Sequence, residues 1–362
     1  MNKRVTWLYC CLLAYITVSA QPMTVRSLQL LQPDTITCTP VKNQFMSGTC
    51  WSFSSMSLLE SELMKNGKGM TDLSEMFIAR YSMKRKIERH LALKGGNFFT
   101  PGGQFHDAIW VMKNYGLMPE EAYTGRGRGE QLHDHAEMDT LLSDQVKEWV
   151  QQGLTKPGVK ENKLIDSLLD YFYGPIPAAF TYKDKSYTPV SFAKQYLGLN
   201  PDDFVEITSY THHPFYKQFV LEDKYNWTGD AYWNVPLNDF ILITHAALDN
   251  GYTVGWDGDA DDPDFHFNNG LAYLRNTWPD DTKARQEAFE TKITELDHMM
   301  HIVGRQEREG HTWYYIKNSW GNDSNPIGGF IWMRDDYFKM RTLAIIVNKK
   351  AIPAGIRRKM GW

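Results

Sequence analysis

Apolar residues in the first half of the chain recur every three or four positions, which is the period of an α-helix. Phe53, Met56, Leu59 and Leu63 follow this spacing, and Gly67 ends the run. The pattern therefore predicts a helix over residues 51–63. Similar runs predict helices over residues 73–94 with Ser74 as cap, 108–115 with Gly116 as stop, 141–150 and 164–172.

After about residue 205 the chain changes to short runs rich in β-branched and aromatic residues, which are typical of strands. Glu307-Arg308-Glu309-Gly310 separates two of them and predicts a hairpin. Helices first and antiparallel strands last predict an α+β fold with two lobes. The strand-like runs cover residues 205–208, 232–235, 252–256, 299–304, 312–317, 329–333 and 342–348. The expected units are a mainly helical lobe over 21–204, a mainly antiparallel β lobe over 205–350 and a C-terminal segment over 351–362.

The first twenty residues have the pattern of a secretory signal peptide. Lys3 and Arg4 precede a mostly apolar stretch from Thr6 to Val18, and small residues stand before Gln21. This stretch is too short to span a bilayer, and no later segment is long enough to do so. We expect cleavage between Ala20 and Gln21 and export to a periplasm or the cell exterior, with no membrane association beyond that export.

Composition indicates a globular protein with little net charge. Hydrophobic residues make up 42% of the chain, and 39 Lys and Arg against 43 Asp and Glu give a net charge of -4. No basic surplus or basic run argues for nucleic acid as a partner. Outside the leader only Cys38 and Cys50 remain, too few for a disulfide scaffold. We expect both thiols to be reduced and Cys38 to be structural.

Cys50 follows a polar turn, Gln44-Phe45-Met46-Ser47-Gly48-Thr49, and lies in the first turn of the first predicted helix. A thiol at a helix N-terminus feels the positive end of the helix dipole, which favours the nucleophilic thiolate. Cysteine is also among the most buried residue types. The residue by itself therefore leaves both a nucleophile and a core thiol open.

A thiol nucleophile needs a base, and the base needs a group that orients it. If the predicted hairpin folds about Glu309, residues whose numbers sum to about 618 face each other. This register sets His301 opposite residue 317 and close to Asn318. The Asn318 side-chain oxygen would then accept the N–H of His301, and Trp320 would cover that hydrogen bond from water.

In this order these residues resemble the papain-like cysteine peptidases, in particular the bleomycin hydrolase and aminopeptidase C branch. Ser47 stands where the secreted papain branch has a disulfide cysteine. The interval from Cys50 to His301 is 251 residues (301 minus 50), against about 130–150 in papain and cathepsins, and long insertions mark the same branch. Further matches extend the resemblance over about residues 38 to 350: Leu73-Ser74-Glu75, Gly102-Gly103-Gln104, Tyr115-Gly116-Leu117-Met118-Pro119, Asn234-Val235-Pro236-Leu237 and Val347-Asn348-Lys349-Lys350.

The resemblance implies a role for each matched residue. Cys50 would be the nucleophile and His301 the general base and then acid, with Asn318 orienting the imidazole. Gln44 would donate its side-chain N–H to the oxyanion, together with the backbone N–H of Cys50. The substrate-binding residues would be Gly102, Gly103 and Trp320.

The resemblance also implies an activity, the hydrolysis of peptide bonds through a thioester intermediate. Aminopeptidase action is favoured, because in this branch the C-terminal segment folds into the cleft and leaves room for few N-terminal residues; residues 351–362 could take that place here. An endopeptidase, a non-peptide amide hydrolase or acyltransferase, and a silent peptide-binding domain are the alternatives. The branch further implies peptide substrates and a homohexamer.

No cofactor and no metal is expected. Residues 257–264 carry alternating carboxylates that are reminiscent of a calcium loop. The sixth position of that loop is Asp262 where the motif needs Gly, and the twelfth is Asn268 where it needs Glu. We therefore interpret the stretch as a solvated acidic loop.

Overall fold

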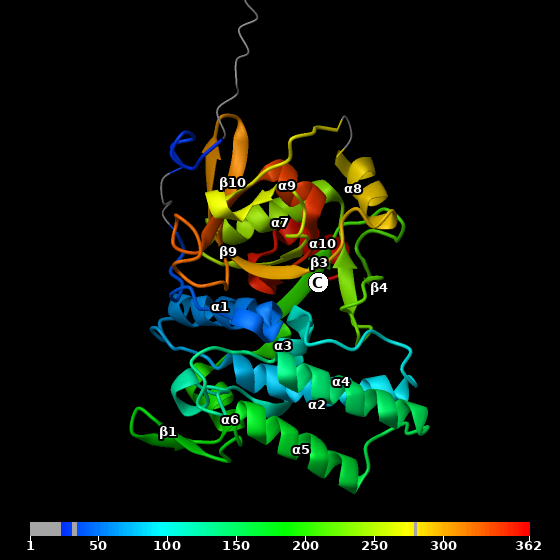
Figure 1. Ribbon diagram of the computed structural model, residues 1–362. Helices are drawn as coiled ribbons and strands as arrows, with labels where there is room; N and C mark the ends of the chain where they lie inside the picture. The colour runs from blue at the N-terminus through cyan, green and yellow to red at the C-terminus, as the bar shows by residue number, and fades with distance from the viewer. Residues whose placement is uncertain (1–22, 31–34, 279–280) are drawn as a thin grey trace, which may run out of the picture.

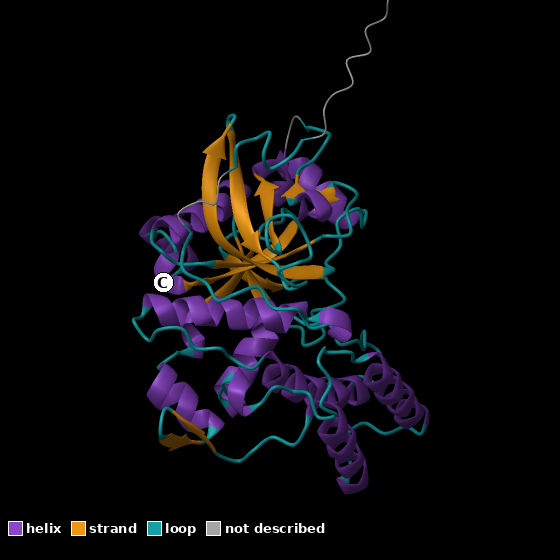
Figure 2. Ribbon diagram, turned by 60° about the vertical axis from the view of Figure 1, so that its left-hand side comes forward, coloured by secondary structure: helices purple, strands orange, loops and turns teal. Residues whose placement is uncertain are grey.

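The computed structural model describes residues 23–30, 35–278 and 281–362, so the expected signal peptide lies outside the described residues. The chain forms a helical lobe and a lobe built around a large sheet, and helix α1 (Cys50–Lys65) lies between them (Figures 1 and 2). Among the described residues, no helix is both long enough and apolar enough to cross a membrane.

The helical lobe contains the helices expected from the periodicity. The Ser74 hydroxyl caps α2 (Glu75–Ala92) and accepts a hydrogen bond from the N–H of Phe77 at 3.1 Å. Gly116 ends α3 with a φ of 85°, and a Cβ there would lie 2.2 Å from the carbonyl oxygen of Pro189. The remaining elements of this lobe are α2 (Glu75–Ala92), α3 (Phe105–Tyr115), α4 (Ala136–Gln151), α5 (Val159–Tyr173), α6 (Pro189–Ser191) and the hairpin of β1 (Phe180–Tyr182) and β2 (Lys185–Tyr187).

The second lobe is built on one mixed sheet and not on a purely antiparallel one. Its strands are β3 (Phe204–Thr208), β4 (Lys217–Val220), β5 (Ala231–Asn234), β6 (Val254–Gly258), β7 (Phe265–His266), β8 (Leu271–Ala272), β9 (His298–Arg308), β10 (His311–Lys317), β11 (Phe330–Arg334) and β12 (Thr342–Asn348), in the order β4-β5-β3-β12-β6-β9-β10-β11-β8-β7. The pairs β3–β5 and β8–β11 are parallel. The expected antiparallel sheet is therefore wrong for these two pairs, because parallel neighbours need a crossover that strand patterns do not reveal.

Helices also cover the sheet of the second lobe, and the sequence pattern did not predict them. They are α7 (Leu237–Asp249), α8 (Asp281–Glu290), α9 (Asp335–Arg341) and α10 (Ala354–Met360). Met299 of β9 packs into the apolar cluster of α1, whereas its neighbour Met300 packs with Phe240 of α7. Because successive strand residues point to opposite faces, the sheet is buried between α1 on one side and α7 on the other.

Two apolar clusters meet at the sheet. Phe204 of β3 packs into the cluster around α1, which also contains Met299 and Ile346 of the sheet, and Val205 packs into the cluster around α7. Leu28 and Leu30 of the N-terminal lead-in pack with Trp313 and Trp332 of the sheet. Met23, Val25 and Cys38 join the same cluster, so these parts of the lead-in contact the β lobe, although their place in the sequence had assigned them to the helical one.

The C-terminal segment does not enter the region around Cys50. Ile356 and Met360 of α10 are buried in the core of the β lobe, and the ring of Trp362 lies 5.1 Å from that of Trp233. Asn348, which precedes the segment, donates to Glu62 near the far end of α1, at 3.0 Å. Twelve residues of helix separate Glu62 from Cys50, which is about 18 Å along the axis. Residues 351–362, which the resemblance allowed to occupy the cleft, therefore lie outside it.

Candidate active site

A cavity opens between the two lobes at the N-terminal end of α1. Cys50 lines this cavity, and 9% of the residue is accessible to solvent. The helical lobe and the start of β9 supply opposite walls. The lining residues are Gln44, Gly48, Cys50, Thr100, Pro101, Gly102, Gly103, Tyr225, Leu296, Asp297, His298 and Met299.

Burial dominates the ionisation of the Cys50 thiol. Removal from water raises its pKa to about 12, and the charges of Asp257 and Asp297 act in the same direction. Backbone hydrogen bonds from Met299 and Trp51 oppose this shift by favouring the thiolate. Burial therefore favours the neutral thiol over the thiolate at this position.

Gln44 is held with one end of its amide toward the cavity. Its backbone N–H donates to the carbonyl of Ser319 at 2.8 Å, and the Ser319 hydroxyl donates to Gln44 Oε1 at 2.6 Å. The Gly321 N–H donates to the carbonyl of Lys42, so the turn after β10 is joined to the segment that carries Gln44. With Oε1 occupied, the side-chain N–H of Gln44 is the donor left for a bound substrate oxygen.

The imidazole that Asn318 orients is that of His298, at the start of β9. His298 Nε2 lies 2.6 Å from Asn318 Oδ1, and the Trp320 ring lies 4.7 Å from the imidazole. The other ring nitrogen, Nδ1, is left for the cavity that His298 lines together with Cys50. Burial lowers the pKa of His298 to about 4, against the opposing effect of the Asn318 hydrogen bond, so the imidazole is neutral at pH 7.

His301 lies elsewhere, and the predicted hydrogen bond between His301 and Asn318 is wrong. His301 Nδ1 lies 2.8 Å from the hydroxyl of Ser57, which also accepts a hydrogen bond from Lys317 at 2.8 Å. Ser57 follows Cys50 by seven residues of α1, which is about 10.5 Å along the helix. His301 is 1% exposed and does not line the cavity of Cys50.

The error comes from side-chain direction and not from register. Lys317 pairs with His301 as predicted, although the pairs nearer the turn are offset by one residue and a bulge between Tyr315 and Ile316 removes that offset. Residues directly opposite each other in a sheet share a face, so the next residue, Asn318, points to the other face. His298 lies three residues before His301, at the start of β9, and reaches Asn318, which directly follows the last residue of β10. The direction of the side chains at these strand ends therefore decides which histidine meets Asn318.

The two predicted glycines shape the wall of the cavity. A Cβ on Gly102 would lie 2.5 Å from the ring of Tyr225, and one on Gly103 would lie 2.9 Å from Trp51. Both glycines line the cavity, so their prediction as substrate-binding residues is compatible with where the structure places them. Trp320 does not line it but covers His298, as described above.

The sequence did not single out several residues that build this cavity. Tyr225 reaches it from the insertion between β4 and β5, and Leu296 and Asp297 directly precede His298. Lys86 of α2 lies behind the wall and donates to the carbonyls of Thr100 (3.1 Å), Pro101 (2.9 Å) and Gly102. The sequence shows only that Asp297 directly precedes a histidine. Tyr225 and Leu296 reach the cavity, and Lys86 reaches its wall, through tertiary packing, which the sequence does not show.

The acidic stretch at residues 257–264 is not the solvated loop that we expected. Asp257, Asp259 and Asp264 are buried, and Asp262 pairs with Arg341 at 2.7 Å. Cys38 and Cys50 are free thiols, in agreement with the expectation that both are reduced.

A buried thiol at a helix N-terminus and an imidazole oriented by an asparagine, across a cleft between two lobes, define the arrangement of a thiol peptidase. The family comparisons agree. The profile of the papain family of cysteine proteases matches residues 27–235, and that of the Peptidase C1-like family matches residues 178–361. The chain belongs to the papain-family cysteine peptidases, within the aminopeptidase C and bleomycin hydrolase branch, and is a cysteine-type peptidase.

Relatives with named activities match most of the chain. Aminopeptidase G of Lactobacillus delbrueckii subsp. lactis is 26% identical, over 86% of this chain and 81% of its own length. Bleomycin hydrolase of Mus musculus is 22% identical, over 87% of this chain and 81% of its own. The crystal structure of PepW from Lactobacillus rhamnosis shares the fold with a TM-score of 0.70 at 18% identity, covering 93% of this chain and 87% of that one.

Proposed function

We propose that this protein hydrolyses peptide bonds with Cys50 as nucleophile, His298 as general base and acid, and Asn318 as the residue that orients His298. One observation carries the assignment: His298 shares the cavity of Cys50 and is held by Asn318 at 2.6 Å. His298 thus takes the role that the sequence had given to His301. Gln44 and the backbone N–H of Cys50 would hold the oxyanion.

The chemistry follows from the neutral state of both groups. As the substrate carbonyl enters, His298 Nδ1 takes the Cys50 proton and the sulfur attacks the carbonyl carbon. The imidazolium then gives this proton to the leaving amine, and the acyl group stays on sulfur as a thioester. Water, deprotonated by His298, hydrolyses the thioester and restores the thiol. Two fixed donors on the oxyanion would each be worth about 10²–10³ in rate.

Aminopeptidase action is the specificity that the relatives support. Matched relatives carry the names aminopeptidase G, E, W and C, and they are matched over most of their length. We therefore propose that the free amino terminus of a peptide is bound near Cys50 and that one or a few residues are released.

Endopeptidase action is a second candidate, because one observation favours it. The C-terminal segment, which would shorten the cleft in this branch, packs beyond the far end of α1. No residue of 351–362 lines the cavity of Cys50. Nothing from this segment would then stop a longer chain from lying across the nucleophile.

Two substrates separate these candidates. Protein beginning at Gln21 would be assayed under reducing conditions with a fluorogenic dipeptide amide, either with a free amino group or N-acetylated. Cleavage of the free form alone supports the aminopeptidase, and equal cleavage of both supports the endopeptidase. Cys50→Ala is the control and should cleave neither; activity in this variant would overturn the nucleophile assignment.

We also propose that the protein is exported, on the basis of the leader-like pattern of residues 1–20. N-terminal sequencing of protein recovered from secreting cells should begin at Gln21. Recovery of the chain from Met1 in the cytoplasm would contradict this proposal.

A further inference from the structure

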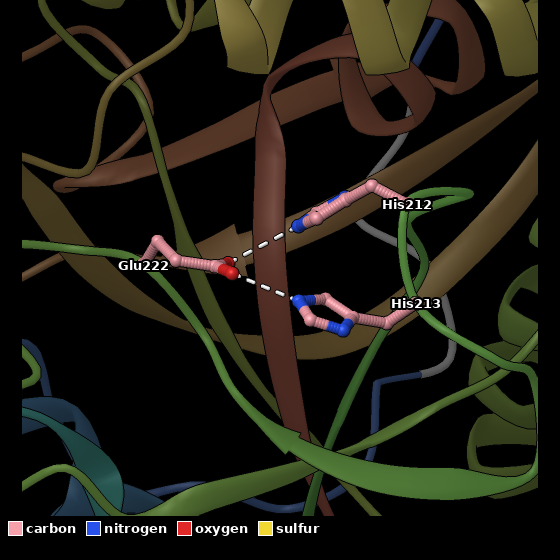
Figure 3. Close-up of side chains that lie close together, drawn as sticks. All are labelled: His212, His213 and Glu222. Atoms are coloured by element: carbon pink, nitrogen blue, oxygen red, sulfur yellow. Dashed lines mark hydrogen bonds and ion pairs between the residues drawn. The ribbon is translucent and has the colours of Figure 1, made fainter.

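Two histidines and a glutamate meet on the β lobe, outside the cavity of Cys50 (Figure 3). His212 and His213 lie in the turn between β3 and β4, and Glu222 follows β4. Figure 3 shows both imidazoles pointing at the one carboxylate. We call this set the His-His-Glu cluster. The peptidase mechanism proposed above uses none of its residues.

The donor atoms of the cluster already stand close to the spacing of a metal site. His212 Nε2 lies 3.1 Å from Glu222 Oε2, and His213 Nε2 lies 2.8 Å from Glu222 Oε1. One ligand atom from each residue falls within 4.8 Å of the others. Tetrahedral zinc with bonds of about 2.0–2.1 Å places its donors about 3.4 Å apart. The two nitrogen–oxygen distances would need to lengthen by only a few tenths of an ångström to reach this spacing.

Neighbouring side chains hold the two rings in place. The His213 ring stacks on Phe219 with centroids 4.1 Å apart, and the His212 ring stacks on Phe289 at 5.7 Å. Gln286 of α8 contacts His212 Nδ1 through its side-chain nitrogen at 2.9 Å. Because both imidazoles are already held in place, fewer side-chain conformations are lost when an ion binds. The entropy cost of binding the ion is therefore smaller.

The ligand types select the kind of ion. Two imidazoles and a carboxylate suit Zn²⁺ and its first-row neighbours, whereas Ca²⁺ and Mg²⁺ prefer oxygen ligands alone. About a quarter of the His212 side chain and half of the Glu222 side chain are exposed, so the site is accessible to an ion and to water. We propose that the His-His-Glu cluster is a site for one divalent transition-metal ion, with Zn²⁺ as the expected occupant and water completing the coordination.

Hydrogen bonding around His212 limits the affinity. Without an ion, Nε2–H of each ring donates to Glu222, and Gln286 donates to His212 Nδ1. Ligation through Nε2 moves the ring proton to Nδ1, so the two donors at Nδ1 and Gln286 would oppose each other. The Gln286 side chain must therefore turn, although its oxygen accepts the Thr211 N–H at 2.6 Å. Replacing Gln286 by Glu supplies an acceptor of the same shape for Nδ1–H and should tighten binding.

Occupation of the site would connect the segment that carries Tyr225 of the cavity wall to a neighbouring turn. Glu222 precedes Asp223, whose carboxylate accepts the N–H of Tyr225 at 2.7 Å, and Tyr225 lines the cavity of Cys50. An ion would fasten this segment to the turn at His212 and His213. Metal binding is therefore expected to stabilise the folded protein against heat.

The test is metal binding by a variant that cannot use the catalytic thiol. Tag-free Cys50→Ala protein, freed of metal with EDTA and dialysed at pH 7.5, would be titrated with Zn²⁺ by calorimetry and with Co²⁺ by visible absorption. We expect one ion per chain and a rise of a few degrees in melting temperature at saturating Zn²⁺. Adding Gln286→Glu should lower the Kd about tenfold.

Single substitutions then locate the site. Glu222→Gln and His213→Gln should each raise the Kd for Zn²⁺ at least tenfold. His311→Gln is the matched control, because His311 contacts one carboxylate, Asp335, at 2.7 Å without a second imidazole, and it should bind as the parent does. Circular dichroism in EDTA would verify that each variant is folded. Less than one-tenth of an equivalent bound by the parent, or a Kd unchanged by both cluster substitutions, would overturn the proposal.

Discussion

At the scale of single residues, burial sets the ionisation of the two groups proposed to react. It raises the pKa of the Cys50 thiol to about 12 and lowers that of His298 to about 4. A thiolate–imidazolium pair would therefore need stabilisation from the attraction between its two charges, from the Asn318 hydrogen bond and from backbone N–H groups. We expect this pair to form when a bound substrate adds further interactions with it.

Matched glutamine substitutions distinguish the two histidines of β9. His298→Gln should lower kcat by about 10⁴-fold, because no group then moves the proton of Cys50. His301→Gln should lower kcat/KM less than about tenfold, since His301 contacts Ser57 and not the cavity. Steady-state kinetics on the free dipeptide amide would measure both. Equal losses in the two variants would contradict the assignment of His298.

Gly102 is expected to matter because of one close neighbour. Gly102→Ala places a methyl group 2.5 Å from the Tyr225 ring, so the wall must shift and KM should rise about tenfold. Tyr225→Ala on the same chain removes the clash and should recover part of that loss. KM values of the two single variants and the double variant would show this coupling. Strictly additive effects would indicate that the glycine acts in another way.

At the scale of elements, the cavity wall depends on a lysine from a helix that does not itself reach the cavity. Lys86 of α2 binds three consecutive carbonyls of the loop that contains Gly102. The Trp51 indole N–H of α1 donates to the Pro101 carbonyl as well, at 3.0 Å. Side chains of two helices thus donate hydrogen bonds to the backbone of one loop and hold that loop in place on the side away from the cavity.

Lys86→Met should loosen this loop and raise KM about fivefold to tenfold at pH 7, with a smaller effect on kcat. Burial lowers the pKa of Lys86 to about 8, so the wild-type ammonium loses its charge above that pH. KM of the wild type should rise above pH 8, and the variant should not show this rise. Lys84→Met is the control, because Lys84 is on the same helix as Lys86 but pairs with Asp166 of α5. A pH dependence of KM that is identical in wild type and Lys86→Met would contradict this role.

The lowered pKa of Lys86 also makes the stability of the fold depend on pH. The unfolded chain holds the Lys86 proton up to its ordinary pKa of 10.5, whereas the folded chain releases it near 8. Between these values the unfolded state binds more protons, so the contribution of Lys86 to the free energy of unfolding rises with pH.

At the scale of the whole molecule, a buried polar network joins the lobes beneath α1. Lys317 of β10 donates to Thr39 at 2.9 Å and to Ser57 of α1 at 2.8 Å, and Thr39 donates to Glu60. His301 completes the network through Ser57. Buried charges of this kind are costly when one partner is lost, because the remaining polar groups cannot reach water. The network therefore makes the packing of the sheet on α1 sensitive to single substitutions.

Lys317→Met should lower the free energy of unfolding by about 3 kcal/mol or more, since Glu60, Ser57 and Thr39 lose a buried donor or counter-charge. Urea denaturation followed by tryptophan fluorescence would measure the loss. Lys113→Met, at the exposed pair with Asp202, should change the midpoint little. A midpoint for Lys317→Met that equals that of the wild type would show that the network does not stabilise the fold.

The sequence predicted well wherever a local cause decides the structure. Ser74 caps α2 and Gly116 ends α3, as their residue types favour. The turn residues also located the hairpin, but the pairing of Lys317 with His301 depends on a bulge between Tyr315 and Ile316 that they do not reveal. Four covering helices of the β lobe were not predicted. One of them, α8, has a mostly polar sequence that gives little apolar periodicity.

The sequence by itself determined the fold class, the nucleophile candidate at the start of α1 and the asparagine that follows β10. These depend on local propensity and on motifs that stay close together in the chain. Only the tertiary structure decided that His298 and not His301 meets Asn318, that Tyr225 and Lys86 build the cavity wall, and that residues 351–362 lie away from Cys50. The physical reason is that side-chain direction across a sheet and the contacts of distant segments depend on three-dimensional packing, which no local pattern records.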